Sequence, residues 1–355
     1  MSNGTTRRPA VPPPVRIRRD VNKLPSSDRT LEFYEKAIAQ MQTLGLDKAL
    51  SWRYQGAIHG YFLDENGEFD VTKDPNHVPG DKLPADRDRF WDQCEHDSWF
   101  FLLWHRIYLH FFEKIIMKII RDKFPDGPKD WALPYWDVTN NPLLPAPFRI
   151  PDDPKVNHLF IPQRSDDVNK GRPFLDLGRG GRPDISKPDT NLNCLKAKTF
   201  KGDKPAFGGR VRHGHGPGLG GTLEQSPHNA VHNDFGSTSF MVNPDKAALD
   251  PIFWLHHSNI DRLWEVWIQR QKQLKRLGRT PKDTDTVPDP KDPTKTIPDP
   301  DGAFYVNAKF RFHDEDGAEA SMKSEDVIDT RQPPLSYEYE DISDPFNGAP
   351  FDGGP

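Results

Sequence analysis

The stretch Trp91–Lys114 constrains the fold more than any other part of the chain, because a helical pattern and metal-binding side chains coincide there. From Trp104 onward, apolar residues recur at spacings of three and four with charged residues opposite, which predicts an amphipathic helix. His105 lies beside the apolar stripe, so its imidazole should face the core and needs a partner there. His96 and Cys94 stand shortly before it. The stretch therefore predicts either half of a metal site or a pair of hydrogen-bonded core histidines.

A second histidine-rich region, SPHNAVHND, places His228 and His232 four residues apart. If this segment is helical, both side chains lie on one face and can reach the same ion. Pro227, at a first-turn position, supports a helix start.

The segment from Asp250 onward, DPIFWLHHSNIDRLWEVWIQRQKQLKRLG, predicts a long helix that ends at Gly278. It carries adjacent histidines whose side chains point about 100° apart, so only one of them can be a ligand of a given site. We assign His257, because it shares a face with Asp261, which could orient an imidazole or hold a neighbouring segment in place. His256, whose face resembles core lining, stays as the alternative.

His59 lies between Ile58 and Gly60, near the end of an apolar patch, and with it the histidines form two potential triplets. All-imidazole triplets suit zinc, copper or iron and leave an open position for catalysis or dioxygen binding. The absence of bridging carboxylates favours copper over a di-iron site. A further histidine tract, HGHGPGLGG with His213 and His215, has glycines that leave its rings unoriented, so we favour a tract without ligands over a metal site there. The triplets are His59, His96 and His105, and His228, His232 and His257.

Composition excludes several classes of protein. With 48 basic against 53 acidic residues, no nucleic-acid partner is indicated. No run of about 18 apolar residues occurs, so we expect no membrane span. Two cysteines, Cys94 and Cys194, cannot form a disulfide framework. The N-terminus has no apolar run after Arg7 and Arg8, so we expect a cytoplasmic protein, with helper-assisted export as the alternative.

The rest of the chain predicts a mainly α fold wrapped in loops, because 36 prolines accompany the helical patterns. We expect a helix over residues 28–44, loops over 64–90, 140–221 and 280–302, and a strand from Phe304 to Phe312 that belongs to a small peripheral sheet. We divide the chain into a Pro/Arg-rich arm (1–25), a single catalytic domain (26–345) and a tail (346–355).

Several segments of the chain, in order, resemble the copper-binding signatures of the tyrosinase and polyphenol oxidase family. They are CEHDSWFFLLWHRIYL from Cys94, GTLEQSPHNAVH from Gly221 and DPIFWLHHSNIDRLW from Asp250, with LPYWD from Leu133 and YEY from Tyr337. The resemblance covers about residues 28–340. It implies a type 3 dicopper centre in a four-helix bundle, with the first triplet on one copper ion (CuA) and the second on the other (CuB).

The resemblance also implies roles for other residues. In fungal relatives, a cysteine two residues before a copper-binding histidine forms a thioether with it, which corresponds to Cys94 and His96 here. Glu224 and Asn229 resemble the family pair that holds a water for deprotonating a monophenol. Without the resemblance, Cys94 is a free thiol and Glu224 a solvated charge at a helix start.

The implied function is that of a tyrosinase, which ortho-hydroxylates monophenols and oxidises o-diphenols to o-quinones with dioxygen. A catechol oxidase or o-aminophenol oxidase without hydroxylase activity is the first alternative. A haemocyanin-like dioxygen carrier is another, but the few residues after Tyr339 are too short for a covering domain, which favours an enzyme. A zinc-loaded structural or hydrolytic protein is a third. Expected partners are phenols and dioxygen, and the sequence leaves open whether a caddie protein delivers the copper.

Overall fold

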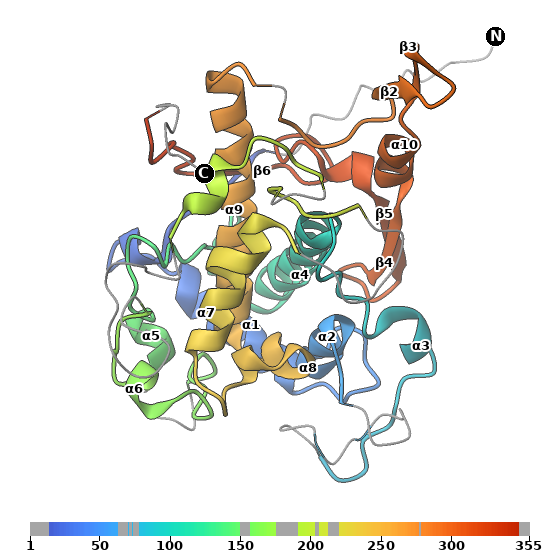
Figure 1. The fold of residues 1–355 in the computed structure, drawn as a ribbon. Coiled ribbons are helices and arrows are strands. Elements are labelled where there is room, and N and C mark those ends of the chain that lie inside the picture. Colours follow the sequence, from blue (N-terminus) through green and yellow to red (C-terminus); the bar gives the residue numbers. More distant parts are fainter. Residues whose placement is uncertain are drawn as a thin grey trace, which may run out of the picture.

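Two long helices, α4 (Phe101–Lys123) and α9 (Pro251–Gln273), pack against each other at the centre of the molecule (Figure 1). With α1 (Thr30–Gln42) and α2 (Trp52–His59) they form a four-helix bundle, so the mainly α prediction is confirmed. The computed structural model describes residues 14–62, 70, 73, 78–149, 157–174, 191–202, 206–211, 220–276 and 278–347. In these ranges, no helix is long and apolar enough to cross a membrane.

The bundle helices start where the sequence supplies caps. The Ser51 hydroxyl accepts the Tyr54 backbone N–H at 3.1 Å and begins α2. The Asp250 carboxylate accepts the Ile252 N–H at 3.1 Å, and Pro251 occupies the first turn of α9. Aromatic rings join the long helices, because Phe112 of α4 stacks on Trp254 of α9. These caps and contacts fix where the histidine-bearing turns lie.

Short elements surround the bundle. In the described residues, three small sheets have two strands each. β1 (Arg16–Arg18) runs parallel to β6 (Tyr337–Tyr339), whereas β2 (Thr286–Asp289) with β3 (Asp292–Pro298) and β4 (Lys309–His313) with β5 (Glu319–Lys323) are antiparallel. Outside the sheets, the short helices of the described ranges include α3 (Arg87–Phe90), α5 (Ala146–Arg149), α6 (Asp166–Asn169), α7 (Ala230–Asp234) and α8 (Pro244–Ala247). The 3-10 turns there include η1 (Val21–Lys23), η4 (Asn193–Lys196), η6 (Phe240–Val242) and η7 (Ser324–Val327).

The prediction of a loop over residues 280–302 is wrong. This region contains the hairpin of β2 (Thr286–Asp289) and β3 (Asp292–Pro298), followed by the start of α10 (Pro300–Asn307). The strand expected from Phe304 to Phe312 is also only partly right, because its first half lies in α10 and only β4 (Lys309–His313) is extended, paired with β5 (Glu319–Lys323). The Asp299 side chain caps α10 by accepting the Asp301 N–H, and this local bond prevails over the alternating pattern.

Other boundaries also differ from the expectations. The last long helix ends at Gln273, not Gly278, because Lys275 adopts a positive φ of 49°. The region 140–221 holds α5, α6 and η4 in its described parts. His213 and His215 lie outside the described residues. The division into arm, domain and tail stays a prediction. Both cysteines are free thiols.

A network of buried charges ties the first and last strands to the bundle. Glu113 of α4 accepts hydrogen bonds from Arg18 of β1 at 2.9 and 3.3 Å, and from the Leu133 N–H at 2.7 Å. Arg18 also donates to the Tyr339 hydroxyl of β6 at 3.0 Å. Burial alone would raise the pKa of Glu113, but Arg18 and Arg16 outweigh it and lower that pKa to about 2. The carboxylate therefore holds three chain segments together in its charged form.

Replacing Glu113 by Gln should lower the free energy of unfolding by about 3–5 kcal/mol at pH 7, because it leaves Arg18 buried without its counter-charge. Since folding depresses the pKa of Glu113 from 4.5 to about 2, its contribution is present above pH 4.5 and is lost as pH falls toward 2. The unfolding free energies of variant and wild type, measured by urea denaturation, should therefore converge at low pH.

Glu32→Gln is the matched control. The pKa of Glu32 is also lowered to about 2, by hydrogen bonds from Arg29 and Lys36, but its side chain is 39% exposed. Solvent screens such a pair, so the loss should be at most about 0.5 kcal/mol. Equal losses of unfolding free energy in Glu113→Gln and Glu32→Gln would contradict a larger contribution from the buried network.

Candidate metal centre

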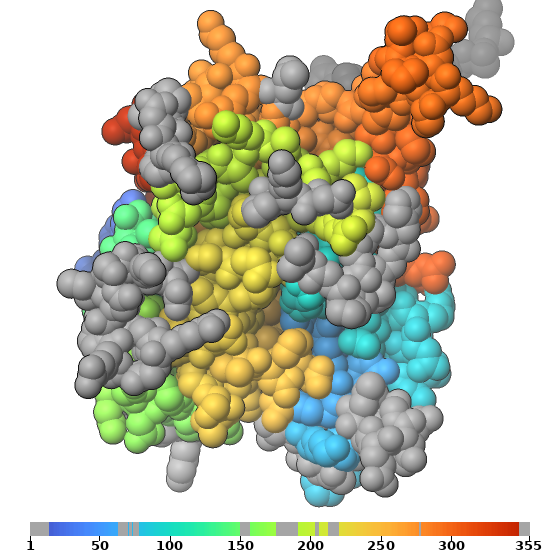
Figure 2. Space-filling model, viewed as in Figure 1, coloured from blue at the N-terminus to red at the C-terminus, as the bar shows by residue number. Residues whose placement is uncertain are grey.

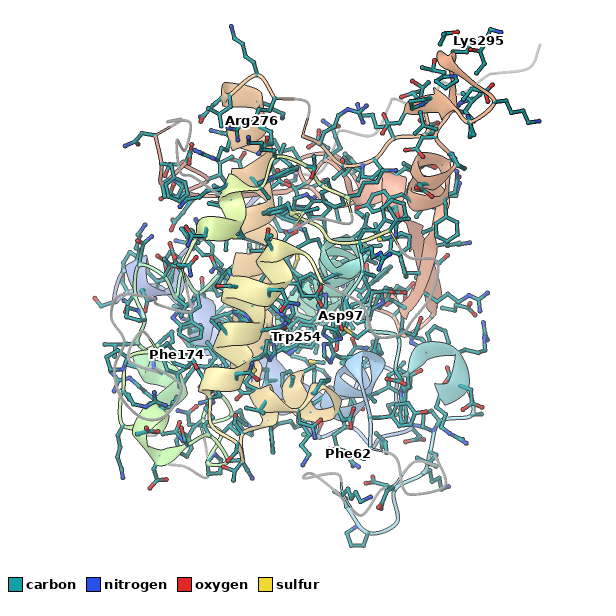
Figure 3. The ribbon with its side chains drawn as sticks, viewed as in Figure 1. Phe62, Asp97, Phe174, Trp254, Arg276 and Lys295 are labelled. Atoms are coloured by element: carbon teal, nitrogen blue, oxygen red, sulfur yellow. The ribbon has the colours of Figure 1, made fainter. Side chains whose placement is uncertain are left out.

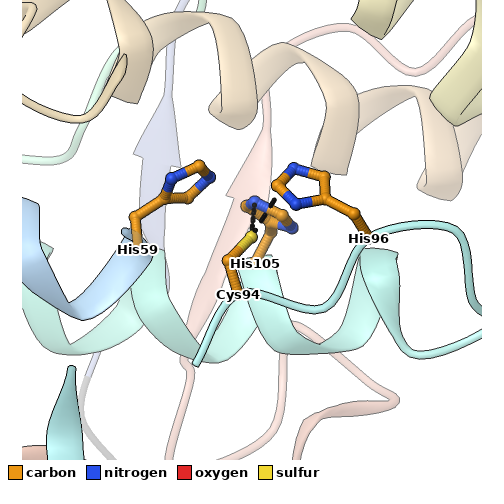
Figure 4. A group of neighbouring side chains, drawn as sticks. All are labelled: His59, Cys94, His96 and His105. Atoms are coloured by element: carbon orange, nitrogen blue, oxygen red, sulfur yellow. Dashed lines mark hydrogen bonds between the residues drawn. The ribbon is translucent and has the colours of Figure 1, made fainter. Parts of the chain in front are cut away.

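The first histidine group assembles from three different segments. His59 is the last residue of α2, His96 lies in the loop before α4, and His105 belongs to the second turn of α4. Together with Cys94, they present ligand atoms that all lie within 4.8 Å of one another. Figure 4 shows the three rings converging on one point, with the cysteine sulfur beside it. The first triplet expected from the sequence is thus brought together.

Backbone carbonyls orient these rings. Nδ1–H of His59 donates to the Pro244 carbonyl at 2.8 Å, and Nδ1–H of His105 donates to the Phe101 carbonyl at 2.8 Å. Because Nδ1 carries the proton, each Nε2 has a free lone pair. Nε2 of His59 is buried without a hydrogen-bond partner among the described residues. An inward lone pair that lacks a donor is what a metal ligand presents.

The second group lies on a short irregular helix. Ser226, in the π-helical turn η5 (Glu224–Asn229), has an extended backbone, and a new helical stretch begins at Pro227 and continues into α7. His228 and His232 therefore share a face, with ring centroids 4.5 Å apart. Nδ1–H of His232 donates to the Met241 carbonyl at 2.6 Å, and Nδ1–H of His228 donates to the Asn229 side-chain oxygen at 2.9 Å.

The structure brings both adjacent histidines of α9 to this second group. Ligand atoms of His228, His232 and His256 lie within 4.8 Å of one another, and neither ring nitrogen of His256 has a partner in the described part of the chain. His257, however, approaches His232 with Nε2 atoms 3.3 Å apart, and its ring stacks on His105 at a centroid distance of 4.2 Å. Proximity alone therefore does not select one of the two.

The two groups adjoin and form one centre. The rings of His96 and His228, from different groups, have centroids 6.1 Å apart. Burial first, and neighbouring imidazoles second, lower the pKa values of His105, His228 and His257 well below the usual range. For His232, burial lowers the pKa to about 4. Neutral imidazoles are the ligand form, and borderline-soft nitrogen donors suit copper, so the residues present fit two copper ions.

Cys94 lies between two rings of the first group. Its Sγ is 3.4 Å from Nε2 of His105 and 3.6 Å from Nε2 of His96. Burial, with a smaller contribution from Glu224, raises the pKa of the Cys94 thiol well above its usual range. The cysteine is therefore a neutral thiol in contact with imidazoles, not a thiolate.

A cavity of about 380 Å³ opens beside the histidines. Figure 2 shows a hollow between the yellow surface of residues 220–247 and the blue and cyan surface to its right. Three elements supply its walls: α2, the loop before α4, and the segment from η5 to α8. The lining residues are His59, His96, Asp97, Glu224, His228, Asn229, His232, Asn233, Met241, Val242, Pro244 and Ala247.

Glu224 is the buried acid of this cavity. Its Oε1 accepts the Asp97 backbone N–H at 2.7 Å, and its Oε2 has no hydrogen-bond partner within the described ranges. Burial raises the pKa of Glu224 to about 8, although the bond from Asp97 opposes the shift. Gly220 lets the carboxylate lie where it does, because a Cβ there would stand 2.4 Å from Oε2. Glu224 and Asn229, both expected at the site, thus line one cavity.

Sequence reasoning missed Asp97 and Asn233 as cavity residues, and it missed the carbonyls of Pro244 and Met241 that orient imidazoles. A signal existed for Asn233, since it follows His232 as Asn229 follows His228. No local pattern marks the carbonyls, because they reach the histidines through the fold.

The chain matches known proteins over most of its length. A profile described as the common central domain of tyrosinase matches residues 49–270, and one described as the polyphenol oxidase middle domain matches residues 297–349. Tyrosinase HcTyr1 of Hahella sp. (strain CCB-MM4) is 34% identical over 92% of this chain and 63% of that protein. The chloroplastic polyphenol oxidase of Malus domestica is 31% identical over 94% of this chain and 50% of that protein. The chain therefore spans less than two thirds of either relative.

Solved structures agree with this match. Latent apple tyrosinase has a TM-score of 0.64 at 27% identity, covering 95% of this chain and 65% of that chain. Polyphenol oxidase of Grenache (Vitis vinifera) has a TM-score of 0.63 at 26% identity, covering 96% and 93%. Since the tyrosinase profile spans more than half of the sequence and encloses two histidine groups that fit copper, the chain belongs to the tyrosinase and polyphenol oxidase family of type 3 dicopper proteins.

Proposed function

We propose that this protein is a copper-dependent phenol oxidase with both tyrosinase activities. In the first, a monophenol and one dioxygen give an o-quinone and water. In the second, two o-diphenols and one dioxygen give two o-quinones and two waters. The observation that carries the proposal is a pair of adjoining neutral imidazole groups beside a cavity that contains a buried carboxyl group. Copper in these groups supplies the redox chemistry with dioxygen, and the chain supplies binding, orientation and proton transfer.

We assign His59, His96 and His105 to one copper ion, and His228, His232 and His257 to the other. His257 is preferred to His256 because its ring stacks on His105, a ligand of the first group, so it lies on the side of the second group that faces the first. Asp261, one turn after His257, forms a buried ion pair with Arg106, which follows His105. That pair keeps the helix faces of His105 and His257 turned toward each other.

Glu224 and Asn229 are assigned to proton transfer. A monophenol must lose its hydroxyl proton to bind as phenolate, and a carboxyl group with a raised pKa is matched to accept it, directly or through a water. Oε2 of Glu224 is available for this contact, since the Asp97 N–H bonds Oε1. The Asn229 side-chain oxygen accepts from His228, which leaves its amide N–H groups for a water or substrate.

A catechol oxidase or o-aminophenol oxidase without hydroxylase activity is the second candidate function. It needs no base for the phenolic proton of a monophenol, so the buried Glu224 carboxyl favours the tyrosinase. Relatives of both kinds match the chain, including one named catechol oxidase B from Solanum tuberosum at 27% identity. A haemocyanin-like role is disfavoured by the cavity beside the histidines, which gives phenols access. A copper-delivery (caddie) protein as partner stays a prediction.

The copper-loaded protein should consume dioxygen with 4-methylcatechol and with 4-methylphenol, and both should yield the same o-quinone. Zinc binds the same imidazoles without redox chemistry, so zinc-loaded protein should do neither. An oxygen electrode and quinone absorbance follow both reactions. Oxidation of the catechol alone would support the second candidate, and oxidation of neither would overturn the proposed function.

In the same assay, Glu224→Gln removes the base but retains an oxygen for the Asp97 N–H. Its rate with 4-methylphenol should fall about 100-fold and its rate with 4-methylcatechol less than about fivefold. Asn229→Leu should depress the monophenol reaction more than the diphenol reaction in the same way. Equal losses with both substrates would contradict the proton-transfer role.

Copper content tests the choice between the adjacent histidines. His257→Gln should retain about one copper ion per chain after dialysis, and His256→Gln about two, as measured by elemental analysis of protein with a native circular dichroism spectrum. The reverse result would transfer the ligand role to His256.

We also propose that copper-loaded protein joins Cys94 to His96 by a thioether. Forming the Sγ–Cε1 bond would break the S–H bond of Cys94 and the Cε1–H bond of His96, and dioxygen would accept the two hydrogens with their electrons to give hydrogen peroxide. The histidines of the first group would hold the copper that supplies this redox chemistry. The contact of Sγ with Nε2 of His96 at 3.6 Å supports the bond, although Nε2 of His105 is slightly closer at 3.4 Å. Copper-loaded protein should be about 2 Da lighter than metal-free protein, an arithmetic consequence of losing two hydrogens, and Cys94→Ser should show no change. A fragment that links Cys94 to His105 would reassign the partner.

A further inference from the structure

Apart from histidines, the ionisable residues that line the described part of the cavity are acidic. Its two ionisable groups other than histidine are acids, Asp97 and Glu224, and no lysine or arginine in the described part of the chain lines it. Glu224 is almost completely buried, whereas Asp97 is half-buried and closer to solvent. Asp97 is therefore the carboxylate that a substrate's outer end can meet.

The backbone of Asp97 is held in place, whereas its carboxylate is available to contact a ligand. Its φ of 53° lies in the left-handed region, which Asp and Asn tolerate better than most residues. Its N–H is fixed by the bond to Glu224 at 2.7 Å. Its carboxylate forms no hydrogen bond or ion pair among the described residues. A placed, half-buried and uncompensated charge is the type of group that recognises an opposite charge on a ligand.

Further acidic residues near the cavity add to its negative charge. Asp92 and Glu95 precede Asp97 in the same loop, and both contribute, after burial and Glu224, to raising the pKa of Cys94. Burial, followed by Asp92, raises the pKa of Asp245, which lies in the first turn of α8 at the opposite wall. The adjacent Lys246 has its Nζ 4.9 Å from the centre of the Phe62 ring, a cation–π contact. Negative charge therefore predominates around the described part of the cavity.

We propose that Asp97 selects phenols and catechols that carry an ammonium group on the side chain opposite the reacting hydroxyls. This inference rests on the proposed function, because the hydroxyl end must face the imidazoles of the metal site. The other end of the ring then extends toward the half-buried rim, where Asp97 lies near the centre of the view in Figure 3. An ammonium tail pairs with the Asp97 carboxylate, and a carboxylate tail is repelled by it.

Three o-diphenols with the same ring test the inference in the copper-loaded protein: 4-(2-aminoethyl)catechol, neutral 4-ethylcatechol and 3,4-dihydroxyphenylacetate. Asp97→Asn is nearly isosteric, tolerates the positive φ and retains the N–H bond to Glu224. Its kcat/KM should fall about three- to tenfold for the amine, rise by a similar factor for the acid, and change less than about twofold for the neutral catechol. Raising the ionic strength should change the kcat/KM of the wild type in the same directions, lowering it for the amine and raising it for the acid.

Asp92→Asn is the matched control, because Asp92 belongs to the same loop, also has a positive φ and does not line the cavity. It should change the amine-to-neutral ratio less than about twofold. Equal changes for all three substrates in Asp97→Asn, or an equal effect of Asp92→Asn, would overturn the inference, since either would indicate a structural or diffuse effect.

A binding measurement separates this inference from the proposed function. In zinc-loaded protein, calorimetric titration with 4-(2-aminoethyl)phenol, 4-ethylphenol and 4-hydroxyphenylacetate reports affinity without turnover. The amine should bind most tightly, and Asp97→Asn should weaken it about three- to tenfold relative to 4-ethylphenol. If these preferences hold but no phenol or catechol is oxidised with copper, the proposed function fails and the charge selection stands. If catechols are oxidised without such preferences, the charge selection fails.

Discussion

The ion pair between Arg106 and Asp261 fixes the relation of the two long helices, on which the candidate site depends. Arg106 of α4 donates to Asp261 of α9 at 2.5 Å, and both side chains are almost fully buried. The hydroxyls of Tyr337 and Tyr339 donate to the second carboxylate oxygen at 2.5 and 2.6 Å. A buried charge offsets its desolvation only when its hydrogen bonds are complete, as they are here. The hydrophobic effect is non-directional, so this pair adds a directional constraint on the rotation of α4 against α9 to the packing of their side chains.

The position of that pair explains its connection with the chemistry. Arg106 follows His105, and Asp261 lies one turn after His257, so the pair and the imidazoles lie on adjoining sides of one helix interface. The imidazoles themselves weaken the metal-free fold, because several buried ring nitrogens lack partners among the described residues. Hydrogen bonds to backbone carbonyls, together with buried ion pairs such as Arg106–Asp261, keep the rings in place despite this loss of stability. The site is therefore preorganised by polar contacts that the metal does not provide.

The sequence predicted those parts of the fold that depend on local periodicity and caps. The helices around His105 and His257 follow from apolar spacing and from the Asp250–Pro251 start. The same Asp–Pro start occurs at Asp299 and Pro300, but the alternation from Phe304 onward also fits a strand, and the cap prevailed. The six proposed ligands could be found from spacing and resemblance. Their orienting carbonyls depend on contacts between distant segments and could not be predicted, whereas the preference for His257 over His256 was drawn from the helix face alone.

One hydrogen bond couples the two halves of the candidate site. The Asp97 N–H, in the loop that carries His96, donates to Glu224, in the turn that carries His228. Any movement of the first histidine group relative to the second must stretch or break this 2.7 Å bond. Since it occupies Oε1 of Glu224 and leaves Oε2 without a hydrogen-bond partner in the described part of the chain, it also determines which oxygen is available to take a proton. The spacing of the proposed metal ligands and the direction of the proposed base are therefore set by the same contact.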